Sequence, residues 1–150
     1  MSFEEKVTWV SGVVTLIVAS WYGWVVVGLV GQGPVEQIAY QRPLLLAVGA
    51  MVVLTIVGSI LTAIGTAIAA EISGEGSVDD VDRKDERDAS IDARGDRVAY
   101  YVASTFMVGV LALAMLEQPH VWIANGVFAA FVVGSLVSSG VKLAAYRRGF

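Results

Sequence analysis

Four long stretches of this 150-residue chain contain no Asp, Glu, Lys or Arg. They run from Val7 to Val35, from Pro43 to Ala70, from Val98 to Leu116 and from Gln118 to Val141. A helix needs about 20 mostly apolar residues to cross a hydrocarbon core of roughly 30 Å, and each stretch is close to that length or longer. Backbone polar groups inside a bilayer are satisfied only in helices or in closed barrels, and barrel strands are short and alternating. These continuous stretches therefore predict membrane-spanning helices.

The composition agrees with this interpretation and excludes several other classes of protein. Hydrophobic residues make up 56% of the chain and charged residues only 16%, and the mean hydropathy is +0.69. A soluble domain usually has about a quarter charged residues. The chain has no Cys and one His, which excludes disulfide scaffolds, thiolate metal sites, cysteine nucleophiles and imidazole clusters. We therefore expect one membrane domain over residues 1–150.

Helix-breaking residues divide the chain into two hairpins. Gly31 to Pro34 end the first apolar helix, and Pro43 suits the first turn of the second, where its missing N–H costs nothing. Glu117 to His120 leave only a short turn between the last two helices, which must then be antiparallel neighbours. We predict an all-α fold, an integral membrane four-helix bundle of two antiparallel hairpins. The transmembrane helices are expected at about 7–30, 43–70, 98–116 and 121–141.

Lys and Arg set the orientation of such a bundle, because cytoplasmic loops carry an excess of them. One side of the predicted membrane has nine: Lys6, Arg83, Lys84, Arg87, Arg94, Arg97, Lys142, Arg147 and Arg148. The other side has only Arg42. We expect a multi-pass protein of the cell (plasma) membrane, with both termini and the loop 71–97 in the cytoplasm.

The loop 71–97 holds most of the charge of the protein. It has ten acidic and five basic residues, a net charge of -5, so the rest of the chain sums to +1. Asp79 with Arg83, and Asp80 with Lys84, are acid-before-base pairs at the i, i+4 spacing that favours a helix. We expect a solvated helix from about Asp79 that continues into the third membrane helix as a cytoplasmic extension.

Polar residues within the apolar stretches lie on single helix faces. In the second helix they are Thr55, Ser59, Thr62 and Thr66, and in the fourth a ladder of small residues comprises Gly126, Ala130, Gly134 and Ser138. Small residues let helices approach closely, and hydroxyls bond across helices or back onto their own, so close packing is the first interpretation. The alternative is a hydroxyl-lined path for a small solute. Asn125, one turn inside the outer end, is expected to bond locally.

The charged loop does not match a metal or catalytic site. Asp80 and Asp82 begin like a calcium loop, but Lys84 stands at the next ligand position and Asp85 where the turn needs Gly. Asp85 and Asp88 are a pair of carboxylates, yet no nucleophile, His partner or Gly-rich loop accompanies them. We expect no catalytic residue, no cofactor and no metal, and the loop is too acidic for nucleic acid.

One short motif resembles a known family. The run is Asp85, Glu86, Arg87, Asp88, Ala89, Ser90 and Ile91, followed by a basic and small segment and a membrane helix. It resembles the Asp-Glu-Arg, three residues, Ile signature of an uncharacterised family of small predicted prokaryotic membrane proteins. There the motif likewise sits on a cytoplasmic stretch before a membrane helix. The resemblance covers about 30 residues and implies a membrane location in a prokaryote, but no particular activity.

The sequence therefore favours a non-enzymatic interaction or assembly protein that uses its charged cytoplasmic loop. The candidate residues for binding a protein partner or a second copy are Asp85, Glu86, Arg87, Asp88 and Ile91. The candidate contacts with lipid headgroups of the bilayer are Arg94, Arg97, Lys142, Arg147 and Arg148. The alternative is a small-solute channel or transporter subunit that uses the hydroxyl face of the second helix.

Overall fold

The computed structural model describes residues 2–30, 32–73 and 86–148. In these ranges the elements are α1 (Phe3–Val30), a short 3-10 helix η1 (Val35–Gln37), α2 (Gln41–Ser73), α3 (Glu86–Met115) and α4 (His120–Arg148). The four α-helices of the described ranges are long and apolar enough to span a membrane. The predicted all-helical fold class is thus confirmed, and the chain is compatible with a multi-pass membrane protein.

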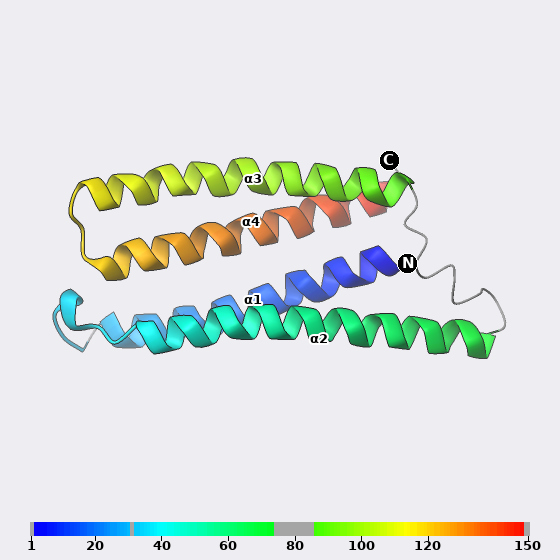
Figure 1. Cartoon of the computed structure of the whole chain (residues 1–150), viewed down its shortest axis with the longest axis horizontal. Helices are drawn as coiled ribbons and strands as arrows, with labels where there is room; N and C mark the ends of the chain where they lie inside the picture. Colours follow the sequence, from blue (N-terminus) through cyan, green and yellow to red (C-terminus); the bar gives the residue numbers. More distant parts are fainter. Residues whose placement is uncertain (1, 31, 74–85, 149–150) are drawn as a thin grey trace.

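The helices lie side by side as two antiparallel pairs (Figure 1). α1 packs along α2, α3 packs along α4, and the two pairs meet chiefly where α1 contacts α4. Pro43 lies in the first turn of α2, as its missing N–H predicts. Between α3 and α4, Glu117 adopts a left-handed φ of 52°. The N–H of Gln118 donates to the carbonyl of Leu113 and that of Glu117 to the carbonyl of Ala114, so two carbonyls at the helix end are satisfied.

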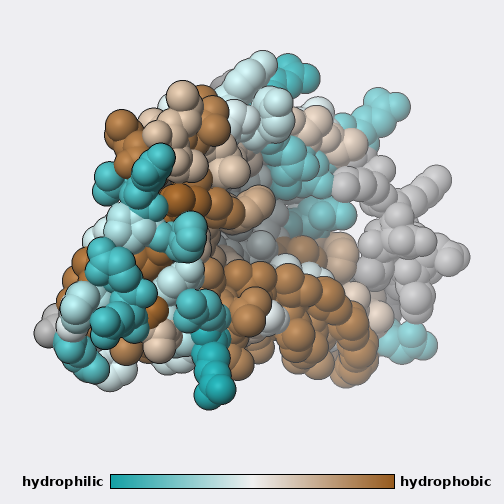
Figure 2. Space-filling view, turned by 60° about the vertical axis from the view of Figure 1, so that its left-hand side comes forward, coloured by the Kyte–Doolittle hydropathy of each residue, from teal (hydrophilic) through white to brown (hydrophobic). Residues whose placement is uncertain are grey.

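The two ends of the molecule differ in charge. The start of α1, the start of α3 and the end of α4 lie together at one end, here called the terminal end, and the connections α1–α2 and α3–α4 lie at the other, the turn end (Figure 1). The described Lys and Arg residues of the terminal half are Lys6, Arg87, Arg94, Arg97, Lys142, Arg147 and Arg148, whereas the turn end has Arg42. Figure 2 shows hydrophilic residues gathered toward the ends, with hydrophobic surface along the helices between them.

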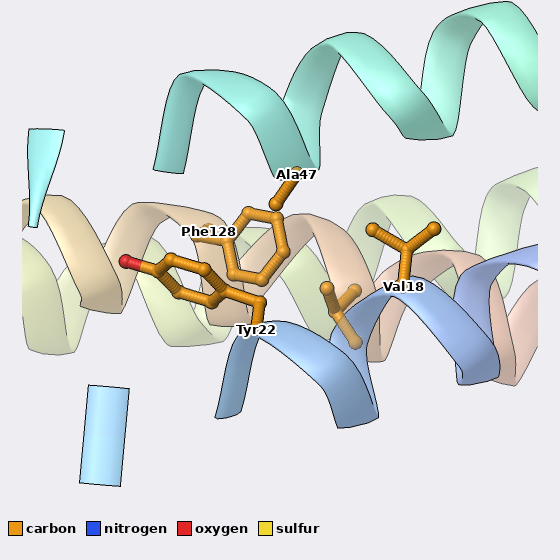
Figure 3. Close-up of a cluster of buried hydrophobic side chains, with 5 residues drawn as sticks. Val18, Tyr22, Ala47 and Phe128 are labelled. Carbon is orange, nitrogen blue, oxygen red and sulfur yellow. The ribbon is translucent and has the colours of Figure 1, made fainter. Parts of the chain in front are cut away.

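The apolar core lies between α1, α2 and α4 in the half nearer the turn end. It consists of the buried side chains of Val18, Tyr22, Ala47, Phe128 and Val132. The rings of Tyr22 and Phe128 meet edge to face, with centroids 4.7 Å apart, and Ala47 approaches from α2 (Figure 3). This cluster fills the middle of the bundle with apolar atoms.

Hydrogen bonds of Tyr22 and Asn125 close this core toward the turn end. The Tyr22 hydroxyl donates to Asn125 Oδ1 over 2.9 Å, and Asn125 Nδ2 donates to the carbonyl of Val121 over 2.7 Å. The expected local bonding of Asn125 is confirmed. It satisfies two polar groups that would otherwise be costly among apolar atoms.

The polar faces predicted in the second and fourth helices take part in packing. A Cβ on Gly126 would lie 2.9 Å from Val110 Cγ2, and one on Gly134 would lie 3.4 Å from Ala103 Cβ, so small residues of α4 let α3 approach closely. In α2, the hydroxyls of Ser59, Thr62 and Thr66 donate to carbonyls of their own helix four residues earlier. The small residues of α4 therefore form a packing surface, and these hydroxyls of α2 bond back onto their own helix.

Candidate functional site

A lysine and two aspartates join α3 to α4 near the terminal end. Lys142 Nζ lies 2.8 Å from Asp96 Oδ1 and 3.3 Å from Asp92 Oδ1. The two aspartates are four residues apart on α3, which places them on the same face of the helix. Ser138, one turn before Lys142 on α4, donates from Oγ to Asp96 Oδ1 over 3.3 Å. We call these four residues the Lys142 cluster.

Gly95 makes room for the Lys142 side chain to cross α3. Gly95 is a buried residue of α3, and a Cβ at this position would lie only 2.5 Å from Lys142 Cγ and 2.6 Å from Lys142 Cε. Real Cβ atoms do not approach other atoms so closely, so any larger residue must displace the lysine stem. α3 continues through Gly95 as a helix. The glycine therefore serves a close approach between α3 and α4.

The Lys142 cluster borders a cavity of about 400 Å³ between the two helix pairs. All four α-helices contribute residues to its wall: Glu4, Val7, Thr8, Ser11, Thr55, Asp92, Asp96, Ala99, Ser135, Ser138, Ser139 and Lys142. Six of these residues carry hydroxyls, three carry carboxylates and one carries an ammonium. The wall is therefore rich in hydrogen-bond acceptors, with more negative than positive charge.

Ser139 is the most notable hydroxyl in this wall. The residue is only 8% exposed, and within the described part of the chain its side chain makes no hydrogen bond. Gly12 of α1 lies against it, since a Cβ on Gly12 would be 3.3 Å from Ser139 Cβ. Ser139 Oγ is not among the fully buried side-chain atoms of the described residues, so this hydroxyl reaches the cavity and can bond a polar ligand or water.

The polar wall of the cavity ends where the apolar core begins. Thr15 on α1 is 3% exposed, and its Oγ1 lies 3.2 Å from Ser135 Oγ on α4, so one hydrogen bond joins the two hydroxyls. One turn further toward the turn end, Val18 and Val132 already belong to the apolar core. The bundle thus has a polar cavity in its terminal half and the apolar core in the half nearer the turn end.

Tyr146 lies on α4 beyond the apolar stretch that ends at Val141. Its hydroxyl is buried and has no hydrogen-bond partner among the described residues. Burial raises the pKa of this hydroxyl above its ordinary value, and the nearby carboxylate of Asp88 raises the pKa further. Tyr146 therefore keeps its proton at neutral pH and packs as a neutral side chain between α4 and the start of α3.

The structure separates the partner-binding residues predicted from sequence into exposed and inward-facing groups. Asp85 lies outside the described residues, as do the predicted helix start at Asp79 and the two acid-before-base pairs. Glu86 and Arg87 are exposed, whereas Asp88 is half-buried and Ile91 is only 3% exposed. In the single chain, Ile91 packs inward.

The predicted headgroup residues are divided in a similar way. Arg94, Arg97, Arg147 and Arg148 are exposed around the terminal end, and Arg147 also lies over the Trp9 ring, 5.8 Å from its centroid. The side chain of Lys142 is only 16% exposed and points to the two aspartates. The structure places Lys142 in an ion-pair cluster between helices.

Sequence reasoning missed the Lys142 cluster and its cavity. Asp92 and Asp96 were grouped with the acidic loop and Lys142 with the basic rim, although the two sets come from different helices of one hairpin. The available signal was a glycine between two aspartates at i, i+4 spacing, because a small residue on a helix face lets another chain segment approach closely.

Comparison of the chain with protein-family models, with curated proteins and with solved structures finds no match.

Proposed function

We propose that the chain is a multi-pass protein of a prokaryotic plasma membrane, a bundle of two antiparallel hairpins with both termini and residues 71–97 in the cytoplasm. The charge difference between the two ends supports this orientation, because the terminal half holds all the described basic residues except Arg42. The first turns of α3, from Glu86 to Arg97, then form a helical cytoplasmic extension. The bilayer covers the apolar helix faces between the two ends.

We further propose a non-enzymatic role in interaction or assembly, which depends on this extension. The observation that supports it is the firm attachment of the extension to α4. One face of the extension packs inward through Ile91 and Gly95 and is tied by the ion pairs of Lys142. The opposite face exposes Glu86, Arg87, Arg94 and Arg97. A helix that is already held in place loses less backbone entropy on binding than a segment that must fold first, which favours recognition of a complementary surface.

A solute path along α2 has less support. The hydroxyls of Ser59, Thr62 and Thr66 are engaged by carbonyls of their own helix. Thr66 also accepts a hydrogen bond from Lys6 Nζ over 3.4 Å. A permeating solute would need these hydroxyls to be available for hydrogen bonds of its own.

Exchanging the charges of the exposed pair tests the interaction proposal. The double variant Glu86→Lys/Arg87→Glu keeps the net charge but reverses the local pattern, and Glu36→Lys/Arg42→Glu makes the same change at the turn end. In native membranes, we expect in-membrane crosslinking of the wild type to a second copy or a protein partner. The first variant should reduce it by at least about tenfold, equivalent to about 1.4 kcal/mol of association free energy. Full crosslinking in the first variant, or equal loss in both variants, would contradict the proposal.

A further inference from the structure

We propose that the cavity beside the Lys142 cluster is a binding site for a small organic amine in its ammonium form. The proposal does not depend on the interaction role or on the orientation in the membrane. It rests on the charge of the cavity wall, on the volume of the cavity, and on the hydroxyl of Ser139, which has no hydrogen-bond partner among the described residues.

The charge of the wall favours a cation. Glu4, Asp92 and Asp96 supply three carboxylates, and Lys142 supplies one ammonium group, so the wall has a net charge of -2 with all four ionised. The Asp96 side chain is 69% exposed, although it already binds Lys142 and Ser138. A carboxylate offers about four acceptor positions, so these two bonds leave room for another donor.

Lys142 shows which kind of group this wall accepts. Its Nζ is a primary ammonium group, and it lies within 2.8 and 3.3 Å of two carboxylate oxygens. A free alkylammonium ion has the same head group with three N–H donors. It therefore meets matching acceptors at the remaining carboxylate positions and at the hydroxyls of the wall.

The size of the cavity distinguishes an organic cation from a bare metal ion. Its volume of about 400 Å³ greatly exceeds the roughly 15 Å³ that one water needs, so several heavy atoms fit. Among the described residues, no group of three or more His, Asp or Glu side chains converges closely enough to hold a metal ion. Dispersed carboxylates and hydroxyls suit a ligand that spreads its polar groups over several ångströms.

Ser139 provides the second, independent observation. Its side chain lines the cavity, is more than nine-tenths buried, and has no hydrogen-bond partner in the described part of the chain. It lies one turn from Ser135 and next to Ser138, on the cavity side of α4. A ligand with N–H donors gives this hydroxyl oxygen the hydrogen bond that no described residue supplies.

Titration calorimetry of the full-length protein in nanodiscs tests the proposal. The probes are 1,4-diaminobutane and its neutral counterpart 1,4-butanediol, at about 150 mM salt to screen distant charges. We expect saturable binding of one diamine per chain and no binding of the diol. Asp96→Asn and Ser139→Ala should each weaken diamine binding, by about tenfold or more for Asp96→Asn, which removes a charge-assisted bond.

Glu36→Gln is the matched control, because it removes a carboxylate at the turn end, outside the cavity. Its affinity for the diamine should equal that of the wild type. Absence of saturable binding, equal binding of the diol, or equal weakening by Glu36→Gln would overturn the proposal. Ser139→Ala is a small change that preserves the fold, so unchanged affinity in that variant would also contradict the assigned site.

Discussion

Replacing Gly95 with leucine is expected to lower the unfolding temperature of the protein markedly. A Cβ at this position would lie 2.5 Å from Lys142 Cγ, and the rest of the leucine side chain extends into the same space. The Lys142 stem must move, which separates its ammonium group from Asp92 and Asp96. Overpacking of this kind costs about 1–3 kcal/mol, and the lost ion pairs add to it. Thermal unfolding in nanodiscs, followed by tryptophan fluorescence, measures the effect.

Gly109→Leu is the matched control on the same helix. A Cβ on Gly109 meets nothing within 4 Å, so the new side chain points to open space. Both substitutions gain the same helix propensity relative to glycine, about 0.8 kcal/mol, and only Gly95→Leu meets Lys142. Gly109→Leu should therefore unfold at or slightly above the wild-type temperature. Equal unfolding temperatures for the two variants would contradict the close packing assigned to Gly95.

Replacing Lys142 with methionine is expected to have the second large effect. Methionine preserves most of the apolar stem but removes the ammonium group, which leaves the carboxylate of Asp92, 19% exposed, without this partner. Removing one member of a buried ion pair costs about 3–5 kcal/mol, and the partial exposure here reduces the expected loss to about 1–3 kcal/mol. The unfolding temperature should fall accordingly.

A second-site change separates the lost charge from lost packing. In Asp92→Asn/Lys142→Met the more buried of the two carboxylates that were left behind becomes neutral, so stability should return at least halfway to that of the wild type. Arg148→Met, which removes an exposed cation from the end of α4, should change the unfolding temperature little. A double variant as unstable as Lys142→Met alone would show that the ion pair is not the source of the effect.

The predictable part of the fold comes from hydrophobicity and helix breakers. Uncharged stretches of membrane-spanning length predicted four helices, and Pro34 and Pro43 bracketed the connection in which η1 lies. Sequence hydropathy depends only on residues near each other along the chain. For this reason it predicted four helices of membrane-spanning length, while the spacing of small residues on the fourth helix separately predicted close packing there.

The cavity was not predictable by the same reasoning, because its wall comes from four different helices. Glu4, Thr55, Asp96 and Ser139 are far apart in sequence, and hydropathy gives no information on which helix faces meet. Asp96 falls within the solvated helix that the sequence predicts, and its side chain is 69% exposed. Lys142 was interpreted as a headgroup residue because a lysine at a helix end usually extends toward the lipid surface. Only the packing of α3 on α4 brings the two together.

The orientation of the bundle is the central claim, because the cytoplasmic extension depends on it. The chain has no Cys, so a single engineered cysteine is a unique label site. Ser90 at the terminal end and Gln118 at the turn end are both exposed. In intact spheroplasts, a membrane-impermeant maleimide should label Gln118→Cys at once and Ser90→Cys only after permeabilisation. Labelling of Ser90→Cys in intact spheroplasts, with Gln118→Cys protected, would contradict the proposed orientation.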